Sequence, residues 1–223
     1  MGGGTVTLPQ ISPFSQNIEA ILDWKKGYNH MNEQEILAMY EDAGALLSGH
    51  FILSSGRHSA RYLQSALVLM DISNATALAT ELIAKIDTDN YDMVVAPAIG
   101  GLVIGQEVAR LLEKPFIFTE RKEGEMQLRR GFSIAEGTRF LVVEDVITTG
   151  GSVRECMDVI RQHGGNPVKI LAVVDRAPDA GERFDVPFAT AISLKVATFE
   201  KRDCPMCQVG TMPAIKPGSR GAA

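Results

Sequence analysis

Residues 141–152 read LVVEDVITTGGS, and this stretch indicates both a fold and a site. Apolar, mostly β-branched residues run directly into the acidic pair Glu144 and Asp145, and a turn rich in hydroxyl groups and glycine follows. Carboxylates accept hydrogen bonds from sugar hydroxyls, while backbone N–H groups at the start of a helix hold a phosphate. The pattern therefore predicts a buried strand whose acidic pair lies where the strand meets solvent, at a binding site for a sugar phosphate.

Short apolar runs alternate with helical patterns on both sides of this stretch. Such alternation predicts βαβ units, and hence an α/β fold with a parallel sheet whose strands are buried on both faces. The expected strands cover residues 93–96, 115–118, 140–144, 168–174 and 189–194, and the expected helices cover residues 74–87, 103–112 and 153–164.

The carboxyl ends of four expected strands carry polar, charged or glycine-rich segments. In open parallel sheets, ligands bind in the crevice at this end of the strands. We therefore expect one crevice lined by residues 98–101, 119–122, 144–145 and 175–176.

The segments outside this alternating region have other patterns. Residues 1–30 are interpreted as an extension dispensable for chemistry, with ordered packing against a partner subunit as the alternative. Asn32 and Glu35 have the spacing of a capping box that opens a helix. Residues 49–70 predict a β-hairpin or meander. Residues 120–137 exceed the usual length of a βα connection, so they form either a functional loop or an excursion of the sheet.

The composition excludes several classes of protein. The chain has 223 residues, long enough for one full α/β domain with appendages, and its 45% hydrophobic and 22% charged content is typical of soluble proteins. A net charge of -5 argues against a nucleic-acid-binding surface. No run approaches the roughly 20 apolar residues of a membrane span, and the start lacks a secretory signal. Three cysteines do not make a paired disulfide framework, so we expect a reducing cytoplasm.

Residues 142–152 closely resemble the phosphoribosyl pyrophosphate (PRPP) motif of type I phosphoribosyltransferases. Four further segments resemble the orotate phosphoribosyltransferase family more specifically, at residues 49–57, 96–101, 120–122 and 175–176. The resemblance runs from about Met31 to Val196. It implies a Rossmann-like phosphoribosyltransferase domain over residues 31–223, with a parallel-sheet core over about 71–195 and a small hood built from 31–70 and 196–223.

The resemblance also assigns roles in binding PRPP. The catalytic residues it implies are Glu144 and Asp145, which would hold the ribose hydroxyls, together with Arg121 and Lys122, which would meet the pyrophosphate. Gly100 and Gly101 would form the pyrophosphate loop, or else a simple strand-to-helix turn. The 5-phosphate would be wrapped by Val146, Ile147, Thr148, Thr149, Gly150, Gly151 and Ser152.

Two residues would contact orotate. The resemblance implies that Arg176 pairs with the orotate carboxylate and that Thr148 touches the ring. The alternative for Arg176 is a surface salt bridge with Asp175. The chain departs from the family at Ser54, where many relatives have lysine, and at residues 123–130, where Arg129 or Arg130 would replace the usual mobile-loop lysine.

The reaction implied is the transfer of ribose 5-phosphate from PRPP to orotate, in pyrimidine biosynthesis. The implied cofactor is Mg²⁺ bound mainly through PRPP, with no dedicated protein ligands, and the implied assembly is a homodimer with shared active sites. The alternatives are a phosphoribosyltransferase that acts on a purine or uracil, and a non-catalytic PRPP sensor. We expect neither nucleic acid nor membrane as a partner.

Cys204 and Cys207 form a single C-x-x-C pair, which is half of a tetrahedral zinc site. The other half would have to come from a partner subunit or from histidines. The histidines at positions 30, 50, 58 and 163 show no ligand spacing. We therefore interpret the pair as structural or incidental, and expect no protein-held metal.

Overall fold

The computed structural model describes residues 30–53, 55–87 and 90–217. The chain divides into two units, Met1–His30 and Met31–Ala223, and all described residues except His30 belong to the second. The interpretation of residues 1–30 as an extension concerns a segment that lies, apart from His30, outside the described residues. Among the described helices, none combines the length and apolar character needed to cross a membrane.

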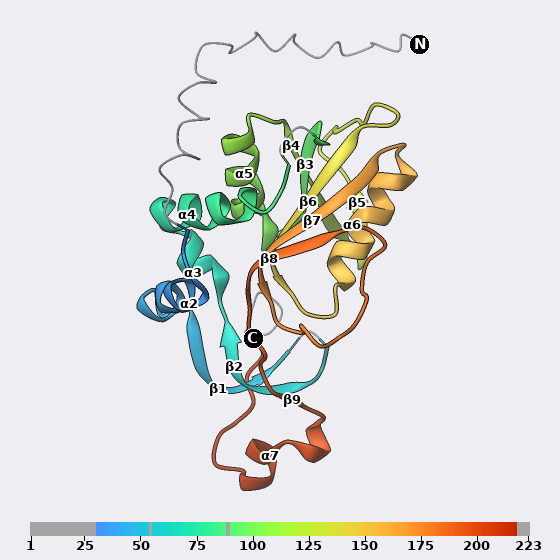
Figure 1. Ribbon diagram of the computed structural model, residues 1–223. Helices are drawn as coiled ribbons and strands as arrows, with labels where there is room; N and C mark the ends of the chain where they lie inside the picture. Colours follow the sequence, from blue (N-terminus) through green and yellow to red (C-terminus); the bar gives the residue numbers. More distant parts are fainter. Residues whose placement is uncertain (1–29, 54, 88–89, 218–223) are drawn as a thin grey trace. The chain divides into compact units, whose positions relative to one another are not determined.

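A six-stranded sheet forms the core of the second unit (Figure 1). Its strand order is β5-β4-β3-β6-β7-β8, and all neighbouring strands are parallel except β5, which pairs antiparallel with β4. The predicted parallel sheet is confirmed, with one antiparallel edge. The strands are β3 (Met93–Pro97), β4 (Phe116–Lys122), β5 (Glu125–Leu128), β6 (Arg139–Ile147), β7 (Asn166–Asp175) and β8 (Phe188–Ser193).

Helices cover both faces of this sheet. In Figure 1, α4 (Ile72–Ile83) and α5 (Gly101–Leu112) lie on one side, and α6 (Gly151–Gln162) lies on the other. The apolar face of α6 packs its fully buried Cys156, Met157 and Ile160 against β6 and its neighbours. Burial of apolar surface between the sheet and these helices is the main favourable contribution to the free energy of folding of this core.

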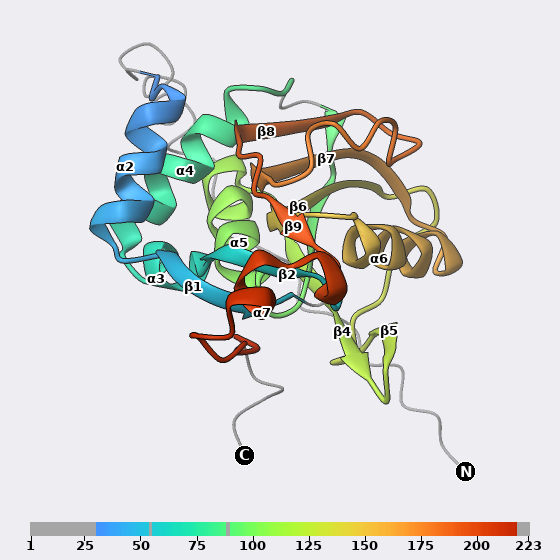
Figure 2. The same ribbon diagram turned by 90° about the horizontal axis from the view of Figure 1, so that it is seen from below.

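A second, three-stranded sheet forms the hood, in the order β1-β2-β9. It joins the hairpin β1 (Leu46–Ile52) and β2 (His58–Leu63) to the late strand β9 (Thr198–Phe199). The chain then forms a 3₁₀ turn, η2 (Lys201–Asp203), and α7 (Pro205–Val209), which Figure 2 shows beside β1 and β2. The predicted hairpin is confirmed, but the prediction extended it too far. Residues 65–69 form helix α3 (Ser65–Leu69) instead.

Helix α2 (Glu33–Asp42) begins at the predicted capping box. The Asn32 side chain accepts hydrogen bonds from the backbone N–H groups of Gln34 and Glu35, at 2.9 and 3.0 Å. The Glu35 carboxylate in turn accepts the Asn32 N–H at 2.8 Å. Because these bonds satisfy donors that the first helical turn leaves free, they fix the start of the helix.

Residues 120–137 begin as an excursion of the sheet, the second of the two predicted alternatives. Strand β4 runs on to Lys122, turns at Glu123 and Gly124 with φ angles of 55° and 93°, and returns as β5. We refer to residues 116–128 as the β4–β5 hairpin. Glycine adopts positive φ without strain, and this explains Gly124 at the tip.

Candidate active site

Glu144 and Asp145 lie inside strand β6 and not at its solvent end. Strand pairing with β7 continues to Ile147, so the prediction that the acidic pair ends the strand was wrong. Glu144 is buried with 6% of its surface exposed, whereas Asp145 is partly exposed. The strand continues because Val146 and Ile147 supply further β-branched residues, and Ile147 is buried in the core.

The two carboxyl groups are linked to each other and to the backbone. The Asp145 N–H donates to Glu144 Oε1 at 3.2 Å, and the Val146 N–H donates to Asp145 Oδ1 at 2.8 Å. Burial, and then the neighbouring Asp145 charge, raise the pKa of Glu144 well above its usual 4.5. Burial also raises the pKa of Asp145, although hydrogen bonds, including one from Ser65, oppose this. The pair therefore retains a proton more readily than two exposed carboxyl groups would.

Gly100 and Gly101 lie directly against the acidic pair. A Cβ atom on Gly100 would stand 2.6 Å from Asp145 Oδ1, and one on Gly101 would stand 2.9 Å from the Val143 carbonyl oxygen and 3.0 Å from Glu144 Oε1. No side chain other than hydrogen fits at such distances without displacement. The structure thus brings the predicted pyrophosphate loop to the predicted ribose site.

The predicted phosphate loop connects β6 to α6. Gly150 has a φ of 77° and lies at the N-cap of α6, where a Cβ atom would be 2.6 Å from the Phe184 ring. The loop carbonyls are held from outside, because Arg183 donates to the Thr148 oxygen at 3.0 Å and Arg154 donates to the Thr149 oxygen at 2.8 Å. With its carbonyls engaged in this way, the start of the helix can present N–H groups to an anion.

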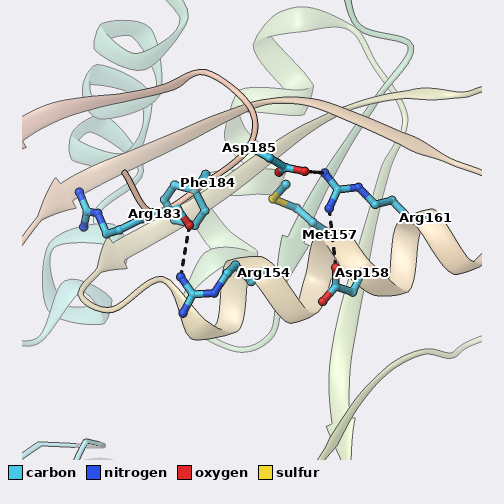
Figure 3. A pocket seen from close by; sticks show the side chains of 7 residues that line it. All are labelled: Arg154, Met157, Asp158, Arg161, Arg183, Phe184 and Asp185. Atoms are coloured by element: carbon cyan, nitrogen blue, oxygen red, sulfur yellow. Dashed lines mark hydrogen bonds and ion pairs between the residues drawn. The ribbon is translucent and has the colours of Figure 1, made fainter. Parts of the chain in front are cut away.

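A pocket of about 300 Å³ lies between α6 and residues 183–185 (Figure 3). Arg154 points from α6 to the Arg183 carbonyl oxygen, at 3.3 Å, and Arg161 forms an ion pair with Asp185 at 2.7 Å. The Arg183 side chain binds Asp175. Each of these arginines thus has an oxygen partner, and two of them, Arg154 and Arg183, also hold the loop carbonyls.

Arg176 lies at the end of β7 with 8% of its surface exposed. Its Nε is buried and has no hydrogen-bond partner among the described residues. Burial lowers the pKa of Arg176, and the nearby Tyr62 opposes this. The alternative of a surface salt bridge with Asp175 is wrong, because Asp175 binds Arg183 at 2.5 Å and Arg176 is not at the surface.

Tyr62 is the hood residue on which the charges of Asp145 and Arg176 act. It lies on β2, and its pKa is raised by burial and then by the Asp145 charge, while Arg176 lowers it. Tyr62 of the hood therefore lies close enough to Asp145 and Arg176 for the charges of both to act on it. The pattern of the sequence did not single out Tyr62, because an aromatic residue in a hairpin is usually a core residue.

Arg121 and Lys122 lie on the β4–β5 hairpin. Arg121 forms an ion pair with Glu155 of α6 at 2.5 Å and donates to the Gly124 carbonyl oxygen at 2.9 Å. Lys122 is exposed. In the part of the chain that the structure describes, no hydrogen bond or ion pair joins either residue to the acidic pair. Arg129 and Arg130 both bind Glu120, at 3.2 and 2.7 Å.

Comparison with known proteins places this arrangement in a family. Residues 68–201 match the phosphoribosyl transferase domain. The orotate phosphoribosyltransferase of Pelotomaculum thermopropionicum is 48% identical over 85% of this chain and 99% of its own length. That of Caldicellulosiruptor bescii is 45% identical over 85% and 99% of the two chains. The chain belongs to the orotate phosphoribosyltransferase family.

A solved structure agrees with this membership. The orotate phosphoribosyltransferase of Aeropyrum pernix superposes with a TM-score of 0.63 at 30% identity, covering 71% of this chain and 93% of that one. Within the phosphoribosyltransferase fold, Arg183 and Arg154 are supporting residues that the sequence did not reveal. Each donates to a backbone carbonyl oxygen of the predicted phosphate loop. Because every residue has such a carbonyl, the sequence contains no pattern that would reveal the contact.

Proposed function

We propose that this orotate phosphoribosyltransferase joins orotate to the ribose 5-phosphate of PRPP, giving orotidine 5′-monophosphate and pyrophosphate, a step of pyrimidine biosynthesis. The observation that carries the choice of acceptor is Arg176, a buried guanidinium whose Nε has no partner among the described residues. A planar guanidinium binds a carboxylate through two parallel hydrogen bonds. Orotate carries a carboxylate, whereas adenine, hypoxanthine and uracil do not.

The groups around the acidic pair match the charges that develop during the transfer. Positive charge builds up on the ribose as the bond to pyrophosphate breaks, and Glu144 and Asp145 are the adjacent carboxyl groups. Ribose hydroxyls would donate hydrogen bonds to their oxygens. The N–H groups of residues 148–152 would hold the 5-phosphate, and the close approach at Gly100 and Gly101 lets the backbone reach the leaving group. Groups fixed before the reaction stabilise such charges most effectively.

The donor set fits Mg²⁺ held mainly by the substrate. Two oxygens of the acidic pair already accept backbone N–H groups, which leaves few free protein ligands. Mg²⁺ commonly keeps several waters and binds substrate phosphates with only one or two carboxylates. When bound, the ion would neutralise charge on the pyrophosphate, and Asp145 would hold the ribose hydroxyls instead of the ion.

We also propose a homodimer in the cytoplasm. The β4–β5 hairpin lies at the edge of the sheet, and Arg121 and Lys122 have no hydrogen bond or ion pair with their own acidic pair within the described residues. Delivery of these cations to the partner's site would complete both sites. The three cysteines are free, as a reducing compartment requires.

The role of Arg176 is tested by Arg176→Ala. We expect the KM for orotate to rise by about 100-fold, because loss of a buried, charge-assisted pair costs several kcal/mol. The KM for PRPP should change by less than about threefold, since no role of Arg176 in PRPP binding is proposed. The matched control is Arg110→Ala, which removes an arginine that binds Glu107 on α5. Equal losses for orotate and PRPP would show that Arg176 is structural.

A further inference from the structure

Four side chains outside the active site converge in the hood. His50 on β1, His58 on β2, Cys204 and Cys207 place their ligand atoms within 4.8 Å of one another. His50, His58 and Cys204 are buried, with 3%, 4% and 0% of their surfaces exposed, and Cys207 is half-buried. The phosphoribosyl transfer uses none of them.

The topology of the hood explains why residues so far apart in sequence meet. In the β1–β2 pairing, Ile52 lies opposite His58, and His50 precedes Ile52 by two residues, where the register between the strands shifts. Their ring centroids are 4.9 Å apart. Strand β9 pairs with β2 and leads into η2 and α7, which carry Cys204 at the helix N-cap and Cys207 in the helix. The sequence showed no ligand spacing because the hairpin, and not the chain, sets the spacing.

Three sulfur–nitrogen distances match those of a tetrahedral metal site. Cys204 Sγ and Cys207 Sγ both lie 3.6 Å from His50 Nε2, and Cys207 Sγ lies 3.4 Å from His58 Nδ1. Zinc bonds of about 2.3 Å to sulfur and about 2.0–2.1 Å to nitrogen place tetrahedral S and N ligands about 3.6 Å apart. The two imidazole nitrogens, His50 Nε2 and His58 Nδ1, are 2.7 Å apart and would separate by about 0.6 Å around such an ion.

The hydrogen bonds around the cluster favour a metal over a polar network. His50 Nδ1 lies 2.9 Å from the Met212 carbonyl oxygen, which accepts its proton and leaves the Nε2 lone pair directed at the cluster. Three atoms surround that nitrogen, from His58, Cys204 and Cys207. One lone pair cannot accept from all three, whereas a cation at their centre satisfies every group.

We propose that His50, His58, Cys204 and Cys207 bind one Zn²⁺ in a closed, structural Cys₂His₂ site. Two thiolates and Zn²⁺ sum to zero charge, so the buried cluster would be neutral, and binding would release the two thiol protons. The ion fastens the C-terminal tail to the hood hairpin. This claim does not depend on the proposed reaction.

The zinc ion would reinforce contacts that the C-terminal tail already makes with the hood hairpin. Arg57 donates to the Thr198 hydroxyl and carbonyl oxygens, both at 2.9 Å, and forms an ion pair with Glu200. Ile215 makes two backbone hydrogen bonds with β1. The Ile52 N–H donates to the Ile215 carbonyl oxygen at 2.8 Å, and the Ile215 N–H donates to the His50 carbonyl oxygen at 2.9 Å. The metal is thus expected to stabilise the sheet that presents Tyr62.

The test is the metal content of the full-length protein, purified without a metal-binding tag. We expect about one zinc per chain, and a Co²⁺-exchanged sample should show the intense visible bands of a tetrahedral thiolate site. Cys204→Ser with Cys207→Ser should abolish both signals. The matched controls, Cys156→Ala and His163→Gln, should keep them, because Cys156 lies on α6 and His163 at its C-cap.

A second measurement avoids reliance on variants that fail to fold. Removal of zinc from the wild-type protein by a chelator should lower Tm by at least about 5 °C, and Zn²⁺, but not Mg²⁺, should restore it. The proposal is overturned if the reduced protein takes up less than about one tenth of an equivalent of zinc. A Cys204–Cys207 disulfide without zinc uptake after reduction would likewise overturn it and assign the pair to redox chemistry.

Discussion

Adjacent carboxyl groups in a buried strand determine the ionisation of this site. Glu144 has the more strongly raised pKa because it is more buried and because Asp145 adds a like charge beside it. The folded state therefore binds more protons than the unfolded state at pH values above the usual 4.5 of a glutamate. By linkage, this group makes the protein less stable as pH rises through that window.

Glu144→Gln should remove this dependence. The amide stays neutral, so we expect Tm to increase relative to wild type at pH 8, and to differ little at pH 4, where the carboxyl is mostly protonated in both states. A gain of about 1 kcal/mol corresponds to roughly 2–4 °C for a chain of this size. Thermal melts at the two pH values measure the effect, with the exposed Glu113→Gln as the control. Equal stabilisation at pH 4 and pH 8 would mean that the gain does not come from the ionisation of Glu144.

Single residues were singled out where polar side chains follow the apolar runs of expected strands, and their roles stay predictions. Glu144, Asp145 and Arg176 were named from the sequence as site residues, and in the structure the charges of Asp145 and Arg176 both act on Tyr62. The partner of Asp175 was not predicted. Arg183 lies 8 residues further along the chain, and only the folded loop between β7 and β8 returns it to Asp175.

The periodicity of apolar residues predicted most helices and strands, but it did not predict where they end. The βα alternation predicted the parallel strands β3, β4, β6, β7 and β8. It missed the extension of β6 past the acidic pair, because polar residues inside a strand look like its end. It also left residues 120–137 open, since a loop of mixed charge and a solvent-exposed hairpin have the same composition.

The β4–β5 hairpin gives a prediction about assembly. If its cations act in the partner's site, an Arg121→Ala, Lys122→Ala double variant and an Asp145→Asn variant should complement each other. Each mixed dimer would then have one site with both defects and one intact site. After the subunits are mixed and exchanged in equal amounts, we expect activity to recover to about one quarter of wild type, because half of the dimers are mixed.

The assay measures phosphoribosyl transfer before and after mixing, beside each variant alone. Activity that stays at the level of the two separate variants, in a sample shown by mass to contain mixed dimers, would place the hairpin in its own protomer's site. A monomer in solution would exclude the shared site altogether.

At the scale of the whole molecule, long-range contacts set the limit of what the sequence could predict. The hood was expected to combine residues 31–70 with the tail, but the expectation came from family resemblance. The pairing of β2 with β9 and the meeting of His50 with Cys204, 154 residues later, depend on how the tail folds back over the hairpin. No local pattern encodes such a contact.

The central claim is that one molecule combines a PRPP cradle with a carboxylate-specific acceptor site. The measurement that tests it most directly is acceptor choice by the purified protein with PRPP and Mg²⁺. We predict that orotate is consumed, with loss of its ultraviolet absorbance, and that adenine, hypoxanthine and uracil at the same concentration are left unchanged. Turnover of a purine or uracil without turnover of orotate would contradict the account.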